Sequence, residues 1–170
     1  MANWCNVRLI VSGQRADVVR FAHHARLRPS AVFSADMLEG EAGPLASERL
    51  QQSGPSLFTK VYRFQARNDD GRNHFRAVSL RFPELQFLLV YFDPASGSCG
   101  SYLVRSGRSR HFLLQESRLE ALMEEHGVLD EPDEDWRYWQ ASWAAMDIAE
   151  THWDQIIVSS PGTHKRNKRA

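Results

Sequence analysis

One stretch of eight residues, from Leu85 to Phe92, limits the fold more than any other part of the chain. Seven of the eight residues are apolar. Successive side chains of a strand point to opposite faces, so a strand of this composition cannot leave either face in water. The stretch therefore predicts a central strand that the rest of the chain covers above and below.

Two longer strands are indicated by alternation between apolar and polar residues. Near the start, over residues 4–12, Val7, Leu9 and Val11 alternate with Asn6, Arg8 and Ile10. Over residues 57–67, one side carries Phe58, Tyr62 and Phe64, and the other carries Thr59, Arg63, Gln65 and Arg67. Shorter strands are predicted at 31–38, 99–105 and 109–115.

Helices are predicted where apolar residues recur every three or four positions. Proline ends two of them, one over 14–28 and one over 72–82. Residues 39–56 are rich in Gly, Pro, Ser and Gln, and we expect a surface loop with at most one helical turn at 45–52. A capping box of Ser117 and Glu120 starts a third helix that Gly127 ends, and the acids at 130–135 start a fourth.

This order of elements predicts an α+β fold: a ferredoxin-like βαββαβ sandwich extended by a β-hairpin, with two C-terminal helices packed on the core. Strands 4–12 and 57–67 would be parallel neighbours, with 85–92 on the other side of the first. Right-handed crossovers would place both core helices on one face of the sheet. We expect a domain over 1–115, a helical extension over 116–160, and a flexible basic tail over 161–170.

Composition is that of an ordinary globular protein, with 170 residues, 42% hydrophobic and 25% charged. No apolar run approaches the ~20 residues that cross a bilayer. A first strand that begins near the first residue leaves no room for a signal peptide, and the two cysteines carry no disulfide pattern. These features predict a cytoplasmic protein.

Charge is unevenly distributed although the net charge is zero. Residues 1–110 carry a net +6, residues 111–154 carry −10, and residues 155–170 carry +4. A basic body followed by an acidic helical segment favours charge pairing within the chain over a platform for a ligand.

Two blocks of the sequence resemble a known bacterial family. They are Asn3-Trp4-Cys5 with Leu9-x-Val11-x-Gly13, and Phe82-Pro83-Glu84-Leu85-x-Phe87 with Tyr91-x-Asp93-Pro94, Gly97 and Gly100-x-Tyr102. In their order and spacing they are similar to the YubB-like family, which is carried on plasmids and genomic islands. The resemblance implies a ferredoxin-like fold and a mobile-element setting. It implies no catalytic residues, because the family has no established activity.

Candidate chemical sites are weak. Cys5 and Cys99 would lie two strands apart, too far for a disulfide, and are expected to be buried thiols. No histidine or cysteine has zinc-ligand spacing, and the run 96–100 is typical of a hairpin turn rather than a phosphate loop. Asp69 and Asp70 could hold a divalent ion but more often form a helix cap. We therefore predict no metal and no cofactor.

The last helix carries a tryptophan stripe, Trp136, Trp139 and Trp143, continued by Met146. An exposed stripe of this size is larger than monomers usually tolerate. It would either pack on this chain's own sheet, which the neighbouring acids and the arginines Arg8, Arg63 and Arg67 favour, or bind a partner.

Three functional hypotheses follow. The favoured one is a non-enzymatic protein-binding module, with Trp136, Trp139, Trp143, Arg8, Arg63 and Arg67 as its interaction surface and a homodimer as one form of partner. The second is a nucleic-acid-binding accessory protein that uses the arginine-rich sheet face and a basic tail made of Lys165, Arg166, Lys168 and Arg169. An enzyme is least favoured, because the motifs assemble no nucleophile–base or acid–base set.

Overall fold

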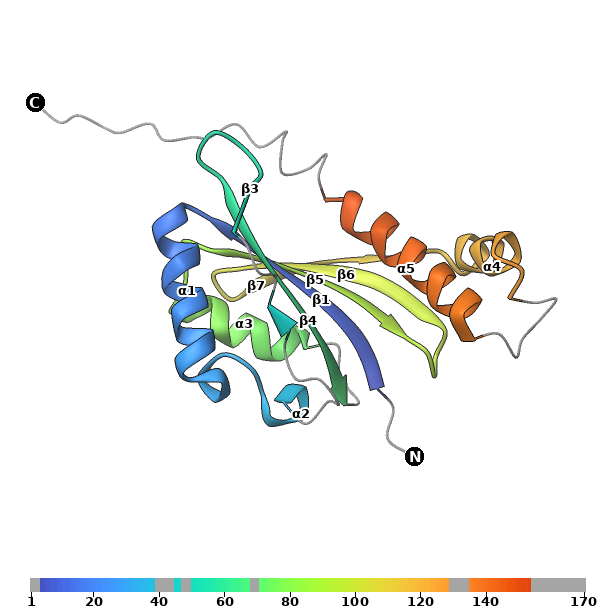
Figure 1. Ribbon diagram of the computed structural model, residues 1–170, viewed down its shortest axis with the longest axis horizontal. Helices are drawn as coiled ribbons and strands as arrows, with labels where there is room; N and C mark the ends of the chain where they lie inside the picture. The colour runs from blue at the N-terminus through green and yellow to red at the C-terminus, as the bar shows by residue number, and fades with distance from the viewer. Residues whose placement is uncertain (1–3, 39–44, 47–49, 68–70, 129–134, 154–170) are drawn as a thin grey trace, which may run out of the picture.

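The computed structural model describes residues 4–38, 45–46, 50–67, 71–128 and 135–153. Figure 1 shows a single sheet with helices on both of its faces. The predicted α+β class is confirmed. The finer ferredoxin-like assignment stays a prediction.

All described strands belong to one sheet, and each described pair of neighbouring strands is antiparallel. The order across it is β2-β4-β1-β5-β6-β7, with β3 also paired to β4. The strands are β1 (Trp4–Gly13), β2 (Leu45–Ala46), β3 (Gln51–Gln52), β4 (Phe58–Arg67), β5 (Gln86–Asp93), β6 (Ser98–Arg105) and β7 (Arg108–Leu113).

Helices cover the sheet in two groups. The first group is α1 (Arg15–Leu27), the 3-10 turn η1 (Pro29–Ala31), α2 (Ala35–Leu38) and α3 (Arg72–Arg81). The second group, on the opposite face, is α4 (Glu116–Glu125) and α5 (Asp135–Thr151). The predicted placement of both core helices on one face is confirmed, because α1 and α3 pack against the same core.

The predicted parallel pairing of the first two long strands is wrong. β1 and β4 are neighbours, but they run antiparallel, with Leu9 opposite Tyr62. The prediction missed β2, which pairs antiparallel with β4 at the edge away from β1. Strand β2 therefore runs parallel to β1. The crossover through α1 leads to β2, and the chain then reverses into β4. A strand of two residues is too short to show an alternating pattern, so β2 could not be predicted from the sequence.

Three smaller predictions are also wrong. The predicted strand at 31–38 is replaced by η1 and α2, and the segment buries Val32 and Phe33 between the two helices and Met37 within α2. The described part of 45–52 forms β2 and β3 instead of a helical turn. Helix α4 begins at Glu116 and has no side-chain cap, so Ser117 lies inside the helix.

The core lies on both sides of β5, as its composition predicted. Toward α1 and α3, Leu89 packs with Phe21, Phe75 and other buried residues. Toward α4 and α5, the neighbouring Val90 packs in a second cluster with Leu119, Leu122 and Ala145. Leu89 and Val90 both have 0% exposure, so the sheet is the middle layer of three.

Gly100, on β6, leaves no room for a side chain. A Cβ atom there would lie 2.5 Å from the Phe112 carbonyl oxygen and 2.7 Å from the Tyr91 hydroxyl. We expect Gly100→Ala to lower the free energy of unfolding by about 1–3 kcal/mol. Gly54→Ala is the control, because its nearest contact would be an ordinary 3.5 Å. Urea unfolding of both variants checks this, and equal stability of the two would contradict it.

Candidate interaction surface

Helix α5 lies close to the sheet because its inner face is made of small residues. Ala141, Ala145 and Ala149 recur every four positions and have 0% exposure. The hydroxyl of Ser101, on β6, donates to the Ala149 carbonyl at 2.8 Å. The indole Nε1 of Trp153 donates to the same hydroxyl oxygen at 2.7 Å. This buried chain of hydrogen bonds fixes the end of α5 on β6.

The predicted packing of the tryptophan stripe on the sheet is wrong for two of its three rings. Trp136 and Trp143 are 54% and 57% exposed, and Trp139 is partly buried. At 100° per residue the inner alanines lie about half a turn around α5 from Trp136 and Trp143. Along most of its length the helix therefore turns the methyl groups of these alanines to the sheet, and Trp136 and Trp143 face away from it. Met146, the fourth member of the predicted stripe, is buried.

The ring that does bury against the sheet, Trp153, was not among the predicted residues. It is 3% exposed and belongs to the core between β6 and α5. The signal for it is the four-residue spacing of Ala141, Ala145 and Ala149, which Trp153 continues. That spacing marks the inner face of the helix better than the tryptophan spacing does.

Arg8, one of the residues predicted on the interaction surface, instead forms ion pairs within the chain. Its Nη1 atom lies 2.7 Å from Asp147 Oδ1 and 2.7 Å from Glu150 Oε2, both on α5. Burial alone would lower the pKa of Arg8, but these two hydrogen bonds and charges outweigh it and raise the pKa. The expected match between acids of the last helix and arginines of the sheet therefore exists at Arg8.

Arg63 and Arg67 are exposed on β4 and form no ion pair with the described residues. Arg63 lies directly opposite Arg8 in the sheet. Since Arg8 is neutralised by α5, the three arginines do not form one cationic site. Lys165, Arg166, Lys168 and Arg169, together with the whole predicted tail, lie outside the described residues, as do Asp69 and Asp70.

The two helical layers have opposite charge. Helices α1 and α3 contain six arginines and one aspartate, whereas α4 and α5 contain seven acids and two arginines. The exposed rings of Trp136 and Trp143 thus lie in the acidic layer. Arg137, whose guanidinium carbon lies 5.5 Å from the centre of the Trp136 ring, is one of the two cations there.

Both cysteines are buried thiols without a disulfide, as predicted. Cys5 belongs to the core under α1 and α3, and Cys99 to the core under α4 and α5. They lie on opposite faces of the sheet as well as on different strands. Burial raises the pKa of the Cys99 thiol to about 12.

The predicted turn at 93–98 joins β5 to β6 and is held by Asp93. Its carboxylate accepts hydrogen bonds from the Ala95 amide at 3.0 Å and from the Ser96 hydroxyl at 2.7 Å. Gly97 adopts a φ of 62° there. Each polar group in the turn supports its geometry.

Comparison of the chain with family models, with curated proteins and with solved structures found no match. Among the described residues, no helix has the length and apolar character that crossing a membrane requires. The same residues contain no group of three or more His, Cys, Asp or Glu side chains placed to hold a metal ion.

The exposed Trp143 of α5 and the buried Trp153, two residues after its end, differ in burial, and their substitution should show it. We expect Trp153→Ala to lower the free energy of unfolding by about 3–5 kcal/mol, because it removes a buried ring and a buried hydrogen bond. Trp143→Ala should change it by no more than about 0.5 kcal/mol. Thermal or urea unfolding measures both, and a large loss for Trp143→Ala would contradict the orientation of the helix.

Stability should fall in alkaline solution because of Cys99. The unfolded thiol releases its proton near its ordinary pKa, about 8.5, whereas the folded one holds it until about pH 12. The contribution of the protonated Cys99 thiol to the free energy of unfolding is therefore complete below about pH 8.5, the ordinary thiol pKa. It is lost progressively as the pH rises from there toward 12. We expect urea midpoints to decline from pH 8 to 11, and to decline less in Cys99→Ala. Parallel declines in the two proteins would contradict this.

Proposed function

We propose that this chain is a non-enzymatic protein-binding module that uses the outer face of α5. The single observation that carries the proposal is the exposure of Trp136 and Trp143, at 54% and 57%. Tryptophan is among the residues that contribute most binding energy at protein interfaces. Two such rings on one helix face are more apolar surface than solvent contact alone explains.

The two rings project from the same side of α5. They are seven positions apart, which is about two helical turns or roughly 10 Å along the axis. Trp139 lies between them, partly buried, and its ring meets Tyr138 edge-on at 5.7 Å. The inner side of α5 is held by Ser101 and Arg8, so binding would not require the helix to leave the sheet.

Charge indicates the kind of partner. Helices α4 and α5 carry seven acids against two arginines, and the four glutamates of α4 are exposed, whereas Asp147 and Glu150 of α5 pair with Arg8. A partner with apolar side chains to contact the rings and lysines or arginines to face the acids would complement this surface. An amphipathic basic helix has both properties.

A synthetic leucine–lysine amphipathic peptide tests the proposal. We expect it to bind the full chain in calorimetric titration, and we expect Trp136→Ala combined with Trp143→Ala to weaken binding at least about tenfold. Leu80→Ala is the matched control, because Leu80 is 65% exposed on the opposite helical layer. A leucine–glutamate peptide controls for charge.

Two results would overturn the proposal. Equal binding of both peptides, or undiminished binding by the double tryptophan variant, would remove α5 as the surface. Salt-sensitive binding of DNA or RNA that is lost in Arg63→Ala with Arg67→Ala would instead favour the nucleic-acid alternative. That alternative has less support, because Arg8 is paired with Asp147 and Glu150.

A further inference from the structure

A second feature, in the basic helical layer, is a groove between α1 and β4 with a volume of about 590 Å³. We call it the α1–β4 groove. Its walls are mainly apolar and include Val19, Ala22 and Ala25 from α1, Phe33 after η1, and Leu50 before β3. The volume falls in the range of sites that bind small organic molecules.

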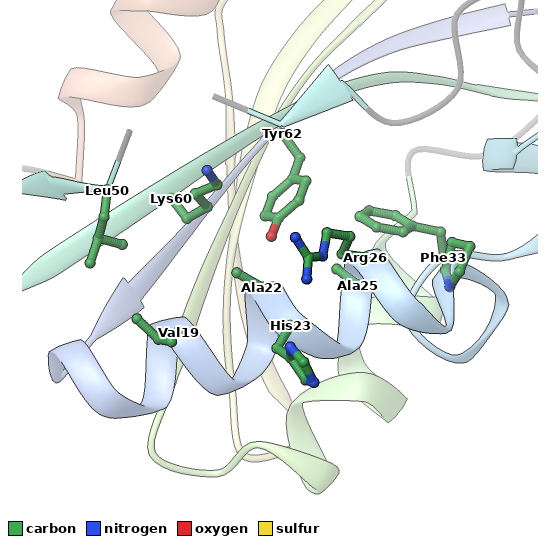
Figure 2. A pocket seen from close by; sticks show the side chains of 10 residues that line it. Val19, Ala22, His23, Ala25, Arg26, Phe33, Leu50, Lys60 and Tyr62 are labelled. Atoms are coloured by element: carbon green, nitrogen blue, oxygen red, sulfur yellow. The ribbon is translucent and has the colours of Figure 1, made fainter. Parts of the chain in front are cut away.

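Tyr62 places a hydroxyl group at the base of the groove. The residue is 3% exposed, and its ring is held edge-on by Phe21 at 5.8 Å and tilted against Phe33 at 5.5 Å. Figure 2 shows the hydroxyl pointing away from β4, toward α1. Among the described residues it has no hydrogen-bond partner, and burial raises the pKa of Tyr62 to about 12. At neutral pH it is a fixed hydrogen-bond donor.

Arg26 brings a positive charge to the same place. Figure 2 shows its guanidinium group turned toward the Tyr62 hydroxyl from α1. It forms no ion pair with the described residues. His23 and Lys60 also line the groove, whereas no acidic residue of the described chain does so. Arg26 therefore places a positive charge beside the apolar wall of the groove.

We infer that the α1–β4 groove binds a small amphipathic carboxylate. Arginine binds a carboxylate with two parallel hydrogen bonds, and the Tyr62 hydroxyl supplies one more donor to the same head group. Arg26 supplies one positive charge and the Tyr62 hydroxyl supplies one neutral donor, and together they suit a head group that carries a single negative charge. An aliphatic body would lie along Val19, Ala22 and Leu50, where it replaces water on apolar surface.

Octanoate is the probe that tests this inference, because it has one carboxylate and one aliphatic body. Titration of the full chain followed by amide NMR should shift signals of α1 and β4. Octan-1-ol, which lacks the charge, and acetate, which lacks the body, should each bind at least about tenfold more weakly. Equal binding of octanoate and octan-1-ol would overturn the assignment of the head-group site.

Variants separate the contacts. Arg26→Gln should weaken octanoate binding about tenfold or more, and Tyr62→Phe, which keeps the buried ring, several-fold. Arg15→Gln removes a charge from the same helix outside the groove and should leave binding unchanged. Ala22→Leu should block the groove while the variant keeps its melting temperature. Undiminished binding by Arg26→Gln or by Ala22→Leu would overturn the inference. The proposal for α5 concerns the opposite layer and is unaffected by either result.

Discussion

A strand that is apolar on both faces has to be covered twice, and β5 is such a strand. Leu89 faces one core and Val90 the other, and both have 0% exposure. One helical layer would leave half of these side chains in water, at a cost of roughly 25 cal/mol for each Å² exposed. The helices α4 and α5 are therefore part of the core, although they follow the last strand in sequence. Their attachment fixes which surface of α5 remains available to a partner.

The sequence predicts those parts of the fold that depend on side-chain period. The alternation along β1 and β4 and the apolar run of β5 indicate strand, face and burial correctly, because each reflects contact with a core. The predicted direction of β4 relative to β1 was wrong. The direction depends on β2, and the two residues of β2 are too few to show an alternating pattern in the sequence. At the candidate site, the burial of α5 was predicted but its rotation was not. The tryptophans were expected on the inner face of α5 because they are large and apolar. In the structure this face is made mainly of alanines, which let the helix pack close to the sheet.

The residues that carry the family resemblance have structural roles in this chain. Leu9, Val11 and Phe87 have no exposed surface. A Cβ atom at Gly13 would lie 2.6 Å from the Leu85 side chain, and one at Gly100 would collide with the Tyr91 hydroxyl. None of these residues presents a reactive group to solvent. The motifs therefore describe how strands pack, whereas Trp136, Trp143 and the α1–β4 groove lie outside them.

The opposite charges of the two helical layers separate charge across the sheet in the described part of the chain, and this separation is an electric dipole. Because the sequence pI is near 7.1, the net charge is close to zero at physiological pH, but the dipole remains. Such a protein turns in the field of a charged surface before it makes contact. It can adsorb to both kinds of ion-exchange resin. The basic helices α1 and α3 would face a cation exchanger, and the acidic helices α4 and α5 would face an anion exchanger. Added salt shortens the reach of both attractions to about 10 Å at 0.1 M. Ionic strength therefore changes how this molecule orients toward a charged surface even at the pH where its net charge is zero.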